Sequence, residues 1–255
     1  MTDPYEFVPF EFQQGILDDS VDATYIIHLE NNGRLAHVMQ QLSVHTPTKR
    51  VFLVKNKGFR KSKKPDFVTS PALDLVDAFI TVFKHAHKFN NILVLEDDFM
   101  FSKWVDTHAS NVNREVNQLS GEFIFLLGCI PCLQIPHTVD TFRVKSLGTH
   151  AIIYSKANRC HTLLVPQQSI KDWDWHNNAS FNRFAYHKPL CYQLFPETEN
   201  ARTWGQGIHK LGPASAQVVR KLFKFLELDK TVEPGTSMCY LLSKWVPVIF
   251  MLAII

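Results

Sequence analysis

The feature that most constrains the fold is an apolar run that ends in three adjacent acids. Residues 92–95 read ILVL, and residues 96–98 read EDD. Four large apolar residues in succession indicate a strand buried on both faces, because a strand with one solvated face alternates apolar and polar residues. Such a strand belongs in the centre of a sheet and needs covering layers on both sides. Its exit carries three carboxylates at one point.

Strands and helices alternate along the chain around this central strand. The apolar and β-branched runs predict strands at 23–29, 50–56, 90–98, 121–128 and 149–155. Helical spacing of apolar residues predicts helices at 31–42, 71–88, 104–119 and 156–165. Ser70 can cap the second of these helices, with Pro71 at its first position. This order predicts an α/β protein with a Rossmann-like, mainly parallel central sheet and helices on both faces.

Composition narrows the class of protein. The chain has 255 residues, with 45% hydrophobic and 20% charged residues, which is typical of a packed globular protein. A net charge of +3 gives no support for a nucleic-acid partner. The five cysteines favour reduced thiols, and "CIPC" at 129–132 is typical of a turn after a strand. The start, "MTDPYEFVPFEF", lacks the pattern of a signal peptide, so we expect a cytoplasmic protein.

The C-terminal stretch is unusually apolar. Residues 245–255 read WVPVIFMLAII, while Lys244 and Pro247 interrupt the longer apolar pattern. Two interpretations stay open: a tail that associates with or anchors in a membrane, and an apolar element that packs on the domain. We divide the chain into a main domain, residues 1–212, and a C-terminal helix with its apolar tail, residues 213–255.

The position of the acids suggests a chemistry. In open α/β sheets, ligands bind beyond the carboxyl ends of the strands, where Glu96, Asp97 and Asp98 are expected. Three neighbouring carboxylates repel one another unless a cation compensates them. Carboxylate oxygens suit Mg²⁺ or Mn²⁺, which also hold the phosphate oxygens of a substrate. The alternative is a solvated strand exit, where acids are common.

Four stretches, in order, give the chain a resemblance to a known group. They are "YIIHLENNGRLAHV", "NILVLEDDFMF", "EFIFLLG" and "LGTHAIIYSKANRCHTLL", and "HKPLCYQLFPETEN" fits a further region more loosely. Together they span about residues 24–200. The "VLEDD" segment resembles the metal-binding acidic motif of GT-A glycosyltransferases. More narrowly, the chain is similar to glycosyltransferase family 25, the lipopolysaccharide and collagen galactosyltransferase group. It departs from that family at His28, where Asn is usual, and at "TENARTWG", where a Ser-Asp element is expected.

The resemblance implies a GT-A fold and a metal-dependent sugar transfer. The donor would be a nucleotide sugar, most simply a UDP-sugar, with Mn²⁺ or Mg²⁺ as cofactor, and the acceptor a glycan, lipid or protein. Asp98 and Glu96 are the expected metal ligands, Glu96 also reaching the ribose, and Asp97 would orient its neighbours. The donor-binding candidates that the resemblance adds are His28, Arg34, Thr149 and His150.

Sugar transfer also needs a general base for the acceptor hydroxyl, and the metal needs a third ligand, so both are expected from segments outside residues 96–98. "KDWDWHNN" at 171–178 has two acids between two tryptophans, and an extended segment would place the acids on one face and the indoles on the other. Asp174 is the preferred base and Asp172 its rival, against the alternative of a surface turn anchored by tryptophan packing. His209 is the expected third ligand. Its rivals are His176 and His187.

Other functions stay in view. The basic cluster between Lys55 and Lys64 is either a solvated face, a lid over a diphosphate, or a patch for anionic lipid headgroups. A catalytically silent GT-A-like module that binds glycans or assembles with a partner is the main alternative to an enzyme. A phosphotransferase or nucleotidyltransferase also clusters acids at strand ends, but neither a GxGxxG nor a GxxxxGK[ST] loop occurs in the sequence.

Overall fold

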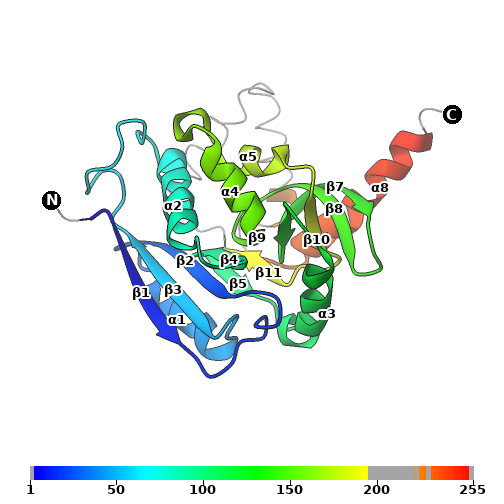
Figure 1. Cartoon of the computed structure of the whole chain (residues 1–255). Coiled ribbons are helices and arrows are strands. Elements are labelled where there is room, and N and C mark those ends of the chain that lie inside the picture. The colour runs from blue at the N-terminus through cyan, green and yellow to red at the C-terminus, as the bar shows by residue number, and fades with distance from the viewer. Residues whose placement is uncertain (1–2, 195–220, 222–223, 228–230, 253–255) are drawn as a thin grey trace.

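The computed structural model describes residues 3–194, 221, 224–227 and 231–252 (Figure 1). The strands are β1 (Tyr5–Glu11), β2 (Ala23–Leu29), β3 (Arg50–Asn56), β4 (Asn91–Glu96), β5 (Phe99–Phe101), β6 (Ile124–Leu126), β7 (Ile130–Pro136), β8 (Thr141–Leu147), β9 (Ala151–Ser155), β10 (Arg183–Tyr186) and β11 (Cys191–Gln193). The helices are α1 (Leu35–Val44), α2 (Pro71–His85), α3 (Val105–Gln118), α4 (Lys156–Leu164), α5 (Trp173–Ala179) and α8 (Gly235–Leu252), with a short 3-10 helix η1 (Gln167–Ser169).

The strands of the described residues form a mixed sheet in the order β1-β3-β2-β4-β9-β6-β10-β8-β7, and β11 pairs with β5 in a small second sheet. Strand β2 runs parallel to β3 and β4, and β10 runs parallel to β6. The other five pairings of the large sheet are antiparallel. The α/β class is therefore confirmed, but the sheet is not mainly parallel as expected. Strand β9 accounts for two of these pairings, because it returns from the β7–β8 hairpin and enters between β4 and β6 in the opposite direction. The other three come from the edge strand β1 and from β8.

Alternate residues of the central strands build two apolar layers. Ile92 and Val94 of β4 pack in one layer with α2, while Leu93 and Leu95 pack in the other with α1 and α3. This is the two-residue period of a strand covered on both faces. Helices on both faces of the sheet were predicted, and the structure confirms them (Figure 1).

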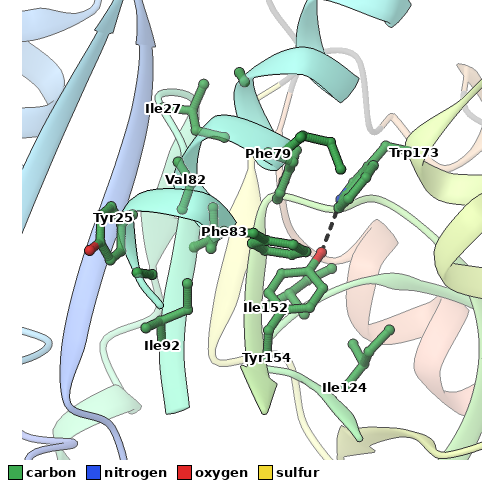
Figure 2. Packing of buried hydrophobic residues seen from close by; sticks show 14 of the residues in the cluster. Tyr25, Ile27, Phe79, Val82, Phe83, Ile92, Ile124, Ile152, Tyr154 and Trp173 are labelled. Carbon is green, nitrogen blue, oxygen red and sulfur yellow. Dashed lines mark hydrogen bonds between the residues drawn. The ribbon is translucent and has the colours of Figure 1, made fainter. Parts of the chain in front are cut away.

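The layer under α2 is aromatic, and it fixes the position of α5. Helix α2 begins as predicted, because Ser70 Oγ accepts a hydrogen bond from the Leu73 amide and Pro71 occupies the first turn. The ring of Phe79 stacks on Trp173 of α5 at 4.5 Å. Trp173 Nε1 donates to the hydroxyl of Tyr154 on β9 at 3.0 Å (Figure 2). Helix α5 is therefore held against both α2 and the sheet.

The C-terminal helix α8 packs on the edge strand β7. Gln134 of β7 is buried, and its Nε2 donates to Tyr240 O at 3.1 Å and to Ser243 Oγ at 2.7 Å. The division of the chain at residue 212 stays a prediction, since that position lies outside the described residues. In the described part of the chain, no helix is long and apolar enough to cross a membrane.

Candidate functional site

The carboxyl ends of β2, β3 and β4 meet at one edge of the sheet, because these neighbouring strands are parallel. Strand β9 starts at the same edge, where Ala151 pairs with Leu95 and the Glu96 amide donates to His150 O at 3.1 Å. The turn before β9 depends on Gly148, which has a φ of 90°, a conformation that favours glycine. The sheet edge therefore places the 28–34 loop, the acids at 96–98 and the 148–150 turn side by side.

Asp97 is bound by the loop that follows β2. Its Oδ2 lies 2.9 Å from His28 Nδ1 and accepts from Asn32 Nδ2 at 2.6 Å and from the Leu29 amide at 3.1 Å. Its Oδ1 accepts from Arg34 at 2.8 Å. Burial alone would raise the pKa of Asp97, but the hydrogen bonds from His28, Arg34 and Asn32 outweigh it and hold the pKa below its ordinary value. Asp97 is thus an ionised anchor with no spare acceptor capacity for a ligand.

Glu96 faces the turn before β9. Its carboxylate accepts a hydrogen bond from the hydroxyl of Thr149. Burial raises its pKa, the nearby Asp98 carboxylate raises it further, and Asp174 and Asp97 add to the effect. Its charged form therefore has no ion-pair partner in the part of the chain that the structure describes.

Asp98 is buried beside Glu96 with one oxygen unused. Its Oδ2 accepts from Gln193 Nε2 at 3.2 Å and lies 3.5 Å from Arg34. Its Oδ1 is buried and has no hydrogen-bond partner among the described residues. Burial raises the pKa of Asp98 although Arg34 opposes the rise. A buried carboxylate oxygen without a partner is unfavourable, so this atom is suited to bind a cation or accept a hydrogen bond from a ligand.

The segment that carries the two candidate bases is a helix and not the extended strand that was expected. Asp172 caps α5 by accepting from the Trp175 amide at 3.0 Å. The two indoles do not share a face: Trp173 is buried in the core, whereas Trp175 is exposed. The tryptophan-anchored alternative thus describes Trp173 correctly. The alternation of acids and tryptophans was taken as the two-residue period of an extended segment. An Asp side chain can instead accept from the amide three residues later and so begin a helix, as Asp172 does here.

Asp174, in the first turn of α5, lies close enough to the acidic site to influence Glu96. It acts electrostatically on Glu96, and its Oδ1 is buried without a partner in the described part of the chain. Burial raises its pKa to about 7, Asp172 adds to the rise, and Arg183 and the Gly148 backbone oppose it. A carboxylate that titrates near neutral pH can exchange a proton under working conditions.

The remaining histidines fall in different places. His150 is buried beside the acids; its Nε2 lies 3.2 Å from Cys191 O, and burial lowers its pKa to about 4. His176 Nε2 lies 3.4 Å from the Thr162 hydroxyl, and His187 Nδ1 lies 3.3 Å from Asp140. Neither contact involves Glu96, Asp97 or Asp98. His209, the expected third ligand, lies outside the described residues.

The basic cluster is partly structural. The ammonium of Lys64 is buried between Asp74 and Asp77 and donates to Tyr5 Oη at 2.6 Å. Lys55 pairs with Glu6 at 3.2 Å. Lys64 therefore fixes the loop to α2 and is not available to a phosphate.

Sequence reasoning missed three polar side chains around the acids: Asn32, Gln193 and Arg183. Gln193 lies in "HKPLCYQ", which was matched only loosely. The guanidinium of Arg183 is buried, donates to Ser146 O at 3.2 Å, and leaves Nε and Nη2 without partners among the described residues. The sequence offers only an arginine before the short run "FAY", and this pattern does not distinguish a buried arginine from a surface one.

The fit to a divalent cation rests on Glu96 and Asp98. The described residues contain no group of three or more His, Cys, Asp or Glu side chains that could hold a metal ion. Mg²⁺ and similar cations, however, are commonly bound by one or two carboxylates together with substrate phosphates and water. The unused Oδ1 of Asp98 and the raised pKa of its neighbour fit a site of that kind.

Comparisons with known proteins give little beyond this geometry. No family model and no curated protein matches the sequence. Among solved structures, a Bacillus anthracis protein described as a glucose-1-phosphate thymidylyltransferase, in complex with sucrose, is similar over 70% of this chain and 73% of its own, with 12% identity and a TM-score of 0.38. This likeness is weak, and it assigns neither a family nor an activity to the chain.

Proposed function

We propose that the protein is a metal-dependent glycosyltransferase of GT-A type that takes a nucleotide-sugar donor, with a UDP-sugar as the first candidate. The observation that carries the proposal is a pair of carboxylates with raised pKa values, the half-buried Glu96 and the buried Asp98, one oxygen of Asp98 having no partner among the described residues. They lie at the carboxyl edge of a parallel set of strands, where nucleotide-binding crevices form. The resemblance of the sequence to glycosyltransferase family 25 supports a nucleotide sugar as the substrate, rather than a nucleotide alone.

Each residue at this edge has a distinct role in the proposal. Asp98 and Glu96 would hold Mn²⁺ or Mg²⁺, which when bound neutralises the charge of a departing nucleoside diphosphate. Asp97 orients the 28–34 loop through His28 and Arg34. Thr149 fixes the Glu96 carboxylate, and His150, kept neutral by burial, supports the same turn.

Asp174 is the candidate base for an acceptor hydroxyl. Its pKa of about 7 matches a group that accepts a proton near neutral pH, and its Oδ1 has no hydrogen-bond partner among the described residues. Asp172 already caps α5, so the structure favours Asp174 of the two. If the reaction inverts the anomeric centre, Asp174 would deprotonate the acceptor hydroxyl as the glycosidic bond forms.

The experiment is a donor screen with a matched pair of variants. The full chain is incubated with UDP- and GDP-sugars with and without Mn²⁺, and donor hydrolysis and thermal shift are measured. We expect one donor to bind in a Mn²⁺-dependent manner, and Asp98→Asn to weaken that binding by at least about tenfold. Asp19→Asn, a change at an exposed acid, serves as the control. A folded protein that neither binds nor hydrolyses any donor contradicts the proposal.

A catalytically silent module is the second candidate. The observations that favour it are His28 in place of the usual Asn and "TENARTWG" where a Ser-Asp element is expected. A silent module keeps its glycan affinity in Asp98→Asn and shows no Mn²⁺ dependence, so the same pair of variants separates the two functions.

A further inference from the structure

Helix α8 has an inner face that packs on the domain and an outer face that does not. The inner residues Thr236, Cys239, Tyr240 and Ser243 are buried and follow helical spacing. The outer face of α8 is apolar and exposed, and it comprises Met238, Leu241, Leu242, Trp245, Ile249 and Leu252. Six exposed large apolar residues on one helix form the kind of continuous patch that a soluble surface rarely leaves uncovered.

Beyond Ser243 the helix leaves the domain. No residue from Lys244 to Leu252 whose side chain the structure describes is buried, and the last turns stand away from the sheet (Figure 1). Residues 245–252 read WVPVIFML, without a charged side chain. In this section the exposed residues, such as Ile249, are apolar, and so are the half-exposed residues between them. A partner protein covers one stripe of a helix, whereas a helix that is apolar all round requires surroundings on every side.

The base of this exposed section carries basic and aromatic side chains. Lys244 and Trp245 are adjacent, and Lys244 Nζ lies 4.9 Å from the Phe142 ring. Lys188, exposed on the neighbouring 187–190 turn, is close enough to act electrostatically on Lys244. Lysine and tryptophan side by side at the start of an apolar section are typical of the level of lipid headgroups, and a second positive charge complements anionic lipid.

From these observations we propose that α8 docks the protein on an anionic phospholipid surface, with residues 245–252 inserted among the acyl chains of one leaflet and Lys244 and Lys188 at the headgroups. Eight helical residues extend only about 12 Å, less than half of a hydrocarbon core of about 30 Å. This depth agrees with the lack of a membrane-crossing helix among the described residues. The proposal does not depend on the activity assigned to the acidic site.

Vesicle flotation of the full chain tests the proposal. Two kinds of vesicle are used: phosphatidylcholine alone, and phosphatidylcholine with phosphatidylglycerol in equal parts. We expect the protein to float with the anionic vesicles and less with the neutral ones. The double variant Trp245→Ser/Ile249→Ser should lose at least about tenfold in vesicle partition. Lys188→Glu, which leaves α8 intact, should lose about fivefold or more on anionic vesicles only.

The matched control is Leu164→Ser, because Leu164 is an equally bare apolar residue at the end of α4, with 84% exposure. It should float like the wild type. The proposal is overturned if the wild type stays in the soluble fraction with both vesicles, or if the Leu164 variant loses binding as the double variant does. It is also overturned if light scattering shows a dimer that the double variant dissociates without any vesicle binding, since a second copy then covers the outer face of α8.

Discussion

Replacing Asp174 with Asn should stabilise the protein at neutral and alkaline pH. Asp174 has a buried oxygen without a partner in the described part of the chain, and burial raises its pKa from an ordinary 3.8 to about 7. The folded protein therefore keeps a proton that the unfolded chain has already released between those two pH values. Stability contributed by this proton is present at low pH and is lost as the pH rises from about 4 to about 7.

The size of the effect follows from the two pKa values. A difference of about three pH units corresponds to about 4 kcal/mol at pH 8, which is an upper bound for a partly relaxed site. Asn has the same shape as protonated Asp and carries no charge at any pH. Asp174→Asn should thus gain up to about 4 kcal/mol at pH 8 over the wild type, and the gain should shrink toward zero near pH 4. Sugar transfer by the proposed base should be lost in the same variant.

Urea unfolding at a series of pH values measures this difference, with the slope of each transition checked for change. Asp19→Asn is the matched control, because Asp19 is an exposed acid and does not contribute to the pKa shift of Asp174. Its stability should stay within about 0.5 kcal/mol of the wild type throughout. If the Asp174 variant follows the wild type in parallel across the whole series, the carboxylate is not desolvated and the reasoning about the site is wrong.

Three further substitutions test how the site is supported. Arg159→Met should cost about 3 kcal/mol in denaturant unfolding, because the buried guanidinium donates to four backbone carbonyls. Lys156→Met, at an exposed position of the same helix, should cost under about 0.5 kcal/mol. Gly128→Ala should lower both stability, by about 3 kcal/mol, and donor affinity, since the added Cβ would overlap Cys191 O and displace β11 with Gln193. Tyr154→Phe should cost about 1–3 kcal/mol, because its hydroxyl accepts from two side chains of α5, and an unchanged melting curve would contradict that role.

Elements with strong local signals could be predicted from the sequence, and those set by distant pairings could not. Helix α2 begins with Ser70 and Pro71 and carries a continuous apolar stripe, so its start was predicted correctly. Strand β1 was missed because Pro9 lies within it, and a proline is compatible with a strand only at a sheet edge. Strand β1 is an edge strand because it pairs only with β3, which lies about 45 residues further along the chain. The residues around Pro9 give no indication of that pairing.

The direction of β9 has the same origin. Residues 151–155 read as a buried strand, and the structure confirms a strand there. Whether it runs with β4 or against it depends on where the intervening hairpin β7–β8 lies in the sheet. The antiparallel solution is what brings Thr149 and His150 to the acidic edge, because the start of β9 then meets the end of β4. A parallel β9 would have placed them at the opposite edge.

The three acids at the end of β4 do different work because the strand ends at Glu96, and Asp97 and Asp98 lie in the turn that follows it, where each carboxylate meets different partners. Asp97 turns toward the 28–34 loop and finds donors in His28, Asn32 and Arg34. Glu96 instead accepts from Thr149, and Asp98 accepts from Gln193. The Asp98 carboxylate raises the pKa of Glu96, and one Asp98 oxygen has no hydrogen-bond partner among the described residues. In the proposed function, the triplet therefore supplies one anchor, Asp97, and one pair of carboxylates two residues apart for the cation.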